Sequence, residues 1–201
     1  MDRREWDARY GGEDLVWTSN PNVFLVSEVA GLTAGRAADL ACGEGRNAVW
    51  LAEQGWQVTG VDFSSVGLAK GRRLAASRHV DVTWVESAIE DWTPPRDGFD
   101  LVAVLYLQLP QPARSAALAV AASAVAPGGT LLVVAHDHDN LARGFGGPPD
   151  EAVLYRARDV TDVAASAGMV VERAEQVVRV VDTEAGHREA IDTLVRAVRL
   201  A

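Results

Sequence analysis

The sequence predicts an α/β fold, with a seven-stranded, mostly parallel β-sheet that has helices on both faces and ends in an antiparallel hairpin. Two observations predict it. Through the first two thirds of the 201 residues, short β-rich segments alternate with helical segments, as in repeated strand–helix–strand units. In the last third, a short polar loop separates two β-rich segments, and a loop of that length joins antiparallel strands.

Five β-rich segments are expected to form the parallel part of the sheet, and three helical segments run between them. Gly55 stops the first of these helices, Ser64 or Ser65 caps the second, and Pro112 opens the third. The expected strands cover residues 36–41, 57–62, 81–85, 100–107 and 130–135; the expected helices cover 47–54, 64 or 65 to 76, and 112–126, with a turn at 127–129.

The last third is expected to hold a helix at 158–167, which Gly168 ends, and strands at 170–181 and 190–198 around a loop at Gly186. Residues 140–150 contain three glycines and two prolines, which predicts a mobile active-site loop. Residues 1–30 are expected to form an N-terminal helical cover. With no repeat or linker in view, residues 1–201 are expected to be one domain.

Composition restricts the class of protein. The net charge is −9 and Lys70 is the only lysine, so we expect no binding to nucleic acid or to anionic membranes. Cys42 is the only cysteine, which excludes an internal disulfide and a multi-cysteine zinc site. The first residues lead into no apolar segment. We therefore expect a cytoplasmic monomer or homodimer with a small-molecule partner.

The strongest motif is the glycine-rich segment DLACGEGRN at 39–47, between an expected strand and an expected helix. Its small residues let a ligand approach the backbone, and the helix start offers free N–H groups. Ala48 stands where a dinucleotide-binding fingerprint has its third glycine. Asp62 ends the next strand, about 20 residues after Gly43, where an acidic residue binds ribose hydroxyls.

The two acidic residues of this motif favour a cationic ligand. Asp39 and Glu44 would repel a pyrophosphate but attract an ammonium group. S-adenosylmethionine (SAM) carries an α-ammonium group, a sulfonium, a ribose and an adenine. Asp39 therefore suits its amino-acid end and Asp62 its ribose diol. The structural alternative is a plain tight turn with a capping aspartate.

Four segments then resemble the class I SAM-dependent methyltransferases, whose fold is Rossmann-like. They are DLACGEGRNAVWLA (39–52), VTGVDFS (58–64), FDLVAVLYLQLP (99–110) and PGGTLLVVAHD (127–137). WDARY (6–10), the stretch from Trp17 to Pro21-Asn22, and GGPPD (146–150) are similar to the small bacterial tellurite-resistance and thiopurine-type enzymes. The resemblance extends from Trp6 to the C-terminal hairpin.

The resemblance implies which residues hold the cofactor. Asp39 and the two glycines hold the methionine part, Asp62 the ribose, and Phe63 flanks the adenine. Where relatives offer an acid to the adenine amino group, this chain has Ala88. The adenine is then held by backbone groups at Ala88 and Ile89, or by Glu86 or Glu90. The full expected cofactor set is Asp39, Ala41, Gly43, Gly45, Asn47, Asp62, Phe63, Ala88, Ile89 and Leu105, with S-adenosylhomocysteine (SAH) as product.

Residues that follow the fourth and fifth strands are the candidates for chemistry, because they lie beyond the carboxyl ends of the sheet. His136 is the first candidate for a general base, with Asp137 as its orienting partner. His138 and Tyr106 are further candidates. A divalent metal at His136 and Asp137 is an alternative without specific spacing, and a solvated loop start is the structural alternative.

The expected function is therefore transfer of a methyl group from SAM to a small molecule, with a hydroxyl as the first choice of acceptor. An S- or chalcogen-oxyanion acceptor, which needs no base, is the alternative within the same class. A SAM-binding protein without catalysis is the alternative outside it. An NAD(P)-dependent oxidoreductase is disfavoured by the missing third glycine, by Asp39 and by the antiparallel tail.

Overall fold

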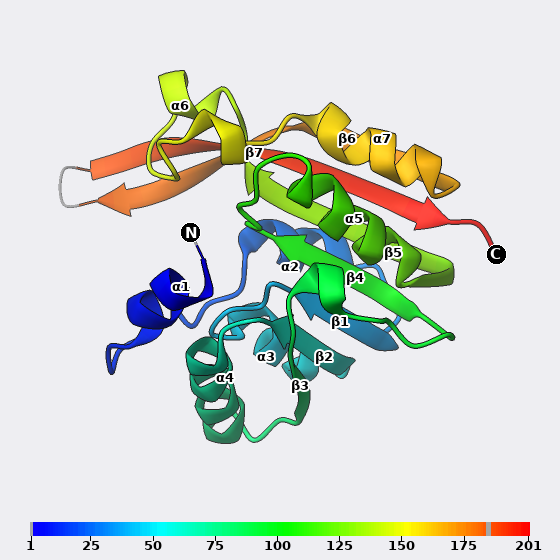
Figure 1. Cartoon of the computed structure of the whole chain (residues 1–201), viewed down its shortest axis with the longest axis horizontal. Helices are drawn as coiled ribbons and strands as arrows, with labels where there is room; N and C mark the ends of the chain where they lie inside the picture. Colours follow the sequence, from blue (N-terminus) through cyan, green and yellow to red (C-terminus); the bar gives the residue numbers. More distant parts are fainter. Residues whose placement is uncertain (1, 184–185) are drawn as a thin grey trace.

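A computed structural model describes residues 2–183 and 186–201. Its strands form a seven-stranded sheet in the order β3-β2-β1-β4-β5-β7-β6, in which β7 alone runs antiparallel to its neighbours. This confirms the expected fold class (Figure 1). The strands are β1 (Arg36–Leu40), β2 (Gln57–Asp62), β3 (Val82–Glu86), β4 (Phe99–Leu105), β5 (Val125–His136), β6 (Met169–Thr183) and β7 (Gly186–Arg199).

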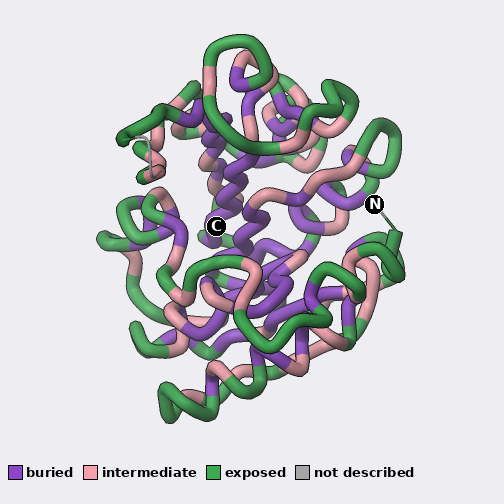
Figure 2. The backbone as a smooth tube through the Cα atoms, turned by 90° about the vertical axis from the view of Figure 1, so that its left-hand side faces the viewer, coloured by how far each residue is buried: buried purple, intermediate pink, exposed green. Residues whose placement is uncertain are grey.

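Helices cover both faces of the sheet, because inward-facing residues of its central strands alternate between two apolar clusters. One cluster includes α2 and α3, and the other includes α5, α7 and the short η1. Figure 2 shows the buried residues as a continuous core with exposed loops around it. The helices are α1 (Arg3–Tyr10), α2 (Val23–Val29), α3 (Arg46–Glu53), α4 (Ser65–Ser77), η1 (Ile89–Asp91), α5 (Ala113–Ser123), α6 (Asn140–Arg143), η2 (Glu151–Val153) and α7 (Ala157–Ser166).

Several boundaries differ from expectation. The expected turn at 127–129 is wrong, because β5 begins at Val125 and continues through these residues as a bulge. Gly128 has a φ of 78°, which permits the bulge. The preceding helix accordingly ends at Ser123 rather than near residue 126. Ser64 caps α4 as expected: its hydroxyl oxygen accepts the Gly67 N–H, and its hydroxyl group donates to Asp7 Oδ1 at 2.5 Å.

The C-terminal hairpin is longer than expected and extends beyond the parallel strands. Pairing between β5 and β7 stops at His136 and Asp192, whereas β6 and β7 stay paired as far as Thr183 and Gly186. The outer part of the hairpin therefore projects past the carboxyl end of β5, on the same side as α1 (Figure 1). The expected loop at Gly186 falls partly on 184–185, outside the described residues.

Candidate functional site

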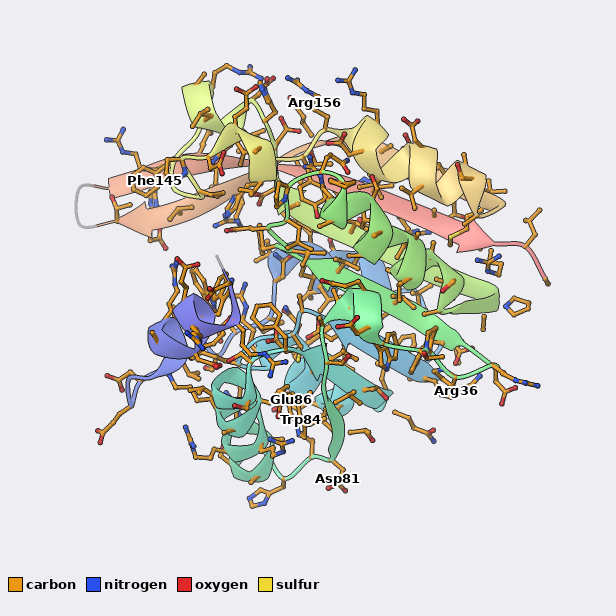
Figure 3. The ribbon with its side chains drawn as sticks, viewed as in Figure 1. Arg36, Asp81, Trp84, Glu86, Phe145 and Arg156 are labelled. Atoms are coloured by element: carbon orange, nitrogen blue, oxygen red, sulfur yellow. The ribbon has the colours of Figure 1, made fainter. Side chains whose placement is uncertain are left out.

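The segment that follows β1 is a turn with three residues in the left-handed region. Ala41, Gly43 and Gly45 have φ values of 57°, 53° and 76°. A Cβ on Gly45 would lie 2.4 Å from the Trp84 ring, because that ring occupies the space beside the turn. Figure 3 shows Trp84 on β3, beside α4. Gly45 is thus required both by its backbone conformation and by the packing of Trp84.

Asp39 lies beneath this turn and is 1% exposed. Its Oδ2 atom has no hydrogen-bond partner among the described residues. Burial raises the pKa of its carboxyl group to about 7, against opposing effects of the Ala48 backbone N–H and the nearby Arg46. A buried carboxylate with one free oxygen fits a cationic donor such as an α-ammonium group.

Asp62 joins the ends of two adjacent strands. Its carboxylate accepts the Gly43 N–H and the Ser64 N–H, each at 2.8 Å. Burial raises its pKa, and these two hydrogen bonds oppose the shift. A carboxylate has about four acceptor positions, so two remain for the hydroxyls of a ribose.

Glu44 does not face the ligand side of the turn, which corrects one step of the sequence argument. Its carboxylate is buried, lies 3.0 Å from Lys70 Nζ, and accepts the N–H groups of Val16 and Trp17 at 3.0 and 3.1 Å. Lys70 also donates to the Asp14 carbonyl. The negative charge of Glu44 is compensated by Lys70, so the preference for a cationic ligand depends on Asp39.

The N-terminal segment covers the turn. Trp6 and Tyr10 stack with ring centroids 5.3 Å apart. A Cβ on Gly43 would lie 2.7 Å from the Tyr10 hydroxyl, so this hydroxyl packs directly against the turn. The Arg9 guanidinium lies 5.0 Å from the Trp17 ring centroid. This arrangement places the helical cover over the glycine turn.

The remaining expected cofactor residues lie at the same edge of the sheet, with one difference. The Asn47 Oδ1 atom accepts the Asn22 N–H at 2.9 Å, so this side chain anchors the start of α2. Ala88 precedes η1 beside Asp62, since the Ser87 N–H donates to the Asp62 carbonyl at 3.0 Å. Phe63 is half-buried and Ile89 and Leu105 are buried. Their roles toward a cofactor stay predictions.

Glu86, one of the two acids considered for the adenine, is engaged elsewhere. Its carboxylate lies 3.1 Å from the Arg3 guanidinium of α1, and Figure 3 shows it at the end of β3. Glu90 is exposed on η1. Which of these groups holds the adenine stays a prediction.

A second group of polar side chains meets at the carboxyl ends of β4 and β5. We call Tyr106, His136, Arg179 and Asp192 the acceptor-side cluster. His136 Nδ1 lies 3.2 Å from Asp192 Oδ1. The Tyr106 hydroxyl donates to Asp192 Oδ2 at 2.8 Å. Arg179 Nε lies 3.1 Å from the Tyr106 hydroxyl oxygen and 3.1 Å from Asp192 Oδ2. Three of the four side chains therefore converge on the fully buried Asp192.

The cluster keeps Asp192 charged and Tyr106 protonated. Burial opposes ionisation of Asp192, but contacts with His136, Arg179 and Tyr106 lower its pKa overall. Burial and the charge of Asp192 raise the pKa of Tyr106, so its hydroxyl remains a donor. Tyr106 also has a φ of 59°, a conformation that costs a non-glycine residue roughly 1–3 kcal/mol and is found most often at functional sites.

Two of the expected catalytic residues lie apart from this cluster. Asp137 is buried, bonds Thr193 Oγ1 at 2.5 Å, and accepts the Asp139 N–H at 2.9 Å, so it is not the partner of the His136 ring. His138 Nε2 lies 2.5 Å from Glu151 Oε1 at the surface. The sequence missed Asp192 and Arg179, because neither belongs to a motif.

The expected active-site loop at 140–150 begins as α6 and packs on His136. A Cβ on Gly147 would lie 3.0 Å from His136 Cγ. Asn140 holds the loop by donating to the Gly146 carbonyl at 2.8 Å and accepting the Ile191 N–H at 2.7 Å. The Phe145 ring, labelled in Figure 3, lies 5.8 Å from the Arg188 guanidinium. Loop and hairpin therefore meet above the cluster.

Two further searches cover the described part of the chain. Within residues 2–183 and 186–201, no three His, Cys, Asp or Glu side chains gather closely enough to hold a metal ion. His136 and Asp137, considered above as metal ligands, face different partners. In the same residues, none of the helices combines the length and the apolar character that crossing a membrane requires.

Comparison with known proteins finds a family that is similar to part of this chain. Residues 37–129 match the family described as "Methyltransferase domain". This part of the chain is similar to that family. The matched region runs from β1 into β5 and includes Asp39, the glycine turn and Asp62. The expected resemblance to the class I SAM-dependent methyltransferases is confirmed.

The curated relatives of this chain differ in their acceptors. Glycine N-methyltransferase of Rattus norvegicus is 28% identical over 190 residues, which cover 87% of this chain and 64% of the relative. The ubiquinone biosynthesis O-methyltransferase of Alkalilimnicola ehrlichii is 33% identical over 112 residues, 54% of this chain and 44% of the relative. The chain thus spans less than two thirds of the length of these relatives.

Solved structures share the fold at low sequence identity. A protein studied in the conversion of a disulfide bond into a thioacetal group during echinomycin biosynthesis has a TM-score of 0.78 at 23% identity, over 98% of this chain and 92% of that one. TehB from Haemophilus influenzae has a TM-score of 0.72 at 14% identity, over 98% and 66%. Both likenesses concern the fold.

Proposed function

We propose that the protein transfers a methyl group from SAM to a small-molecule acceptor, and that the acceptor-side cluster removes the acceptor's proton. Three observations support this proposal. Residues 37–129 match the methyltransferase-domain family, Asp39 offers an unpartnered carboxylate oxygen beneath the glycine turn, and a histidine–aspartate pair lies at the same edge of the sheet.

The residues around the turn fit SAM. Asp39 binds the α-ammonium group through its free oxygen, and Asp62 accepts from the ribose hydroxyls while keeping its bonds to the backbone. Backbone groups at Ala88 and Ile89 hold the adenine. SAM supplies a methyl group activated by its positive sulfonium. The work of the protein is to align a nucleophile with that methyl group and to remove its proton.

The 3.2 Å approach of His136 to Asp192 is the observation that carries the proposed mechanism. Nδ1 lies within ion-pair distance of the carboxylate but not in hydrogen-bond geometry; with the proton on Nδ1, next to this charge, Nε2 is the basic nitrogen of the imidazole. Asp192 stabilises the positive charge that the ring acquires when it takes a proton. His136 is 14% exposed at its side chain, so loop residues shield it from water without enclosing it.

A hydroxyl remains the first acceptor that this base suits, because an alcohol or phenol must lose a proton during methylation. An amine is the second candidate, favoured by the similarity to glycine N-methyltransferase over 87% of this chain. An ammonium group must also lose a proton before it can attack. A sulfur or chalcogen anion would not need His136 at all.

The first test is calorimetric titration with SAM, SAH and NAD⁺. We expect both adenosyl ligands to bind and NAD⁺ not to bind; binding of NAD⁺ alone would overturn the proposal. Radiolabelled SAM then serves to screen hydroxyl, amine and thiol acceptors. SAH binding without any transfer across the screen would favour the non-catalytic alternative.

The base is tested by His136→Ala, with His138→Ala as the matched control on the same loop start. Loss of a general base lowers kcat by roughly 10²- to 10⁴-fold. We expect that loss for His136→Ala only, with SAH affinity unchanged and partial rescue by added imidazole. Transfer near the wild-type rate in His136→Ala would show that His136 is not the base.

A further inference from the structure

Arg179 lies in the part of β6 that extends past the parallel strands, and its guanidinium enters the acceptor-side cluster. Its Nε lies 3.1 Å from both the Tyr106 hydroxyl and Asp192 Oδ2. Its guanidinium carbon lies 5.7 Å from the centroid of the Tyr106 ring. These contacts fix the plane of the guanidinium while leaving a quarter of the side chain exposed.

The terminal nitrogens of Arg179 are not used by the described residues. A guanidinium has five N–H donors, and only the Nε–H has an acceptor here. Two other arginines of the same hairpin differ. Arg173 reaches Glu28 through Nη1, and Arg196 reaches Glu28 and Glu172 through both terminal nitrogens. Arg179 is thus positioned through its Nε–H, with four donors left for a ligand.

A second arginine approaches the same space from the cofactor turn. Arg46, the first residue of α3, lies close enough to Asp39 and Arg179 for their charges to act on it. Its guanidinium makes one long contact, 3.5 Å to the Asn20 carbonyl. The nearby acidic groups are already assigned, since Asp192 faces Arg179 and His136, and Asp39 suits the ammonium group of SAM.

We infer that Arg179 binds a carboxylate of the acceptor, so that the enzyme methylates small molecules that carry an anionic group beside the nucleophile. A planar guanidinium with paired free donors matches a carboxylate in bidentate geometry. An acceptor anchored on Arg179 has its nucleophile within the same cluster as His136. Arg46, next to the turn, is available to the carboxylate of SAM itself. This inference rests on the proposed function.

The test follows the Nε–Hε signal of Arg179 by NMR in SAH-saturated protein, with benzoate as probe and benzamide as its uncharged match. We expect benzoate to shift the signal to saturation and benzamide to leave it unchanged at equal ionic strength. Arg179→Gln should bind benzoate about 10- to 100-fold more weakly than the wild type. The affinity of Arg179→Lys should lie between those two, and Arg173→Gln should bind like the wild type.

The outcomes separate this inference from the proposed function. Absence of a benzoate-induced shift, or an equal response to benzamide, overturns the inference while SAH binding stands. If SAH does not bind, the proposed function fails, and the same titration of the SAH-free protein still tests Arg179. For any acceptor found in the screen, Arg179→Gln should raise the acceptor KM and leave the KM of SAM unchanged; the reverse pattern assigns Arg179 to SAM.

Discussion

The two halves of the candidate site are built in different ways. The cofactor turn comes from one short segment after β1, together with Asp62 from the adjacent strand. The acceptor-side cluster takes its side chains from the end of β4, from β5, from β6 and from β7, and residues 106 and 192 meet across 86 positions of sequence. A short motif specifies the first half, whereas only the folded sheet assembles the second.

This difference explains what the sequence could predict. Asp39, Gly43 and Gly45 stand in a motif whose spacing already implies a strand, a turn and a helix. His136 is predictable because it lies at the end of a β-rich segment. Its partner was assigned to Asp137, the neighbour in sequence, whereas the antiparallel register of β5 and β7 places Asp192 opposite it. No local pattern reveals that register, because it depends on the length of the hairpin.

The fold was more accessible to prediction than the site. The alternation of strands and helices predicts the fold class, and the short final loop predicts the hairpin. The bulge at Gly128 was missed, because Pro-Gly-Gly ordinarily marks a turn and only pairing with β4 keeps it within a strand. The buried ion pair between Glu44 and Lys70 has no sequence signal, because helix α4 brings together two charges that are 26 positions apart.

The largest expected effect comes from a substitution that disrupts the glycine turn. Gly45→Val introduces both a left-handed backbone strain of about 1–2 kcal/mol and a clash with Trp84 that adds roughly 1–3 kcal/mol. We expect the midpoint of thermal unfolding to fall sharply and SAH binding to be lost. Gly55→Ala is the control, since Gly55 has a φ of 89° but open space around it. Equal stability of the two variants would contradict the packing role of Trp84.

The second prediction tests whether Asp192, rather than Asp137, orients the base. Asp192→Asn keeps the shape but removes the charge beside His136, and we expect kcat to fall by up to about 100-fold. Asp137→Asn disturbs the contact with Thr193 and should lower thermal stability more than kcat. A larger kcat loss in Asp137→Asn would restore the partner suggested by sequence alone.

The smallest predicted effect concerns pH and Asp39. Its pKa is raised from 3.8 to about 7, so below pH 7 the cofactor-free fold holds a proton that the unfolded chain releases. This group therefore lowers the stability of the cofactor-free fold progressively as pH rises from about 4 to 7. A cationic ligand prefers the ionised carboxylate, so SAM affinity should increase by up to about tenfold between pH 6 and pH 8.

Calorimetric titrations across that pH interval measure this effect, and proton release on binding in buffers of different ionisation enthalpy gives an independent value. Asp39→Asn should bind SAM weakly at every pH and show no such increase. An unchanged pH dependence in that variant would assign the titration to another group and leave the role of Asp39 unsupported.

The burial of Lys70 in its ion pair with Glu44 has a practical consequence. Lys70 is the only lysine of the chain, its side chain is 3% exposed, and residues 14–17 lie over it. An amine-acylating reagent can therefore reach a side-chain amine only when the N-terminal segment lifts away. The rate of labelling at Lys70 therefore reports how often the N-terminal segment opens, without any engineered probe. Comparing this rate with and without SAH measures how far a bound ligand keeps the segment closed.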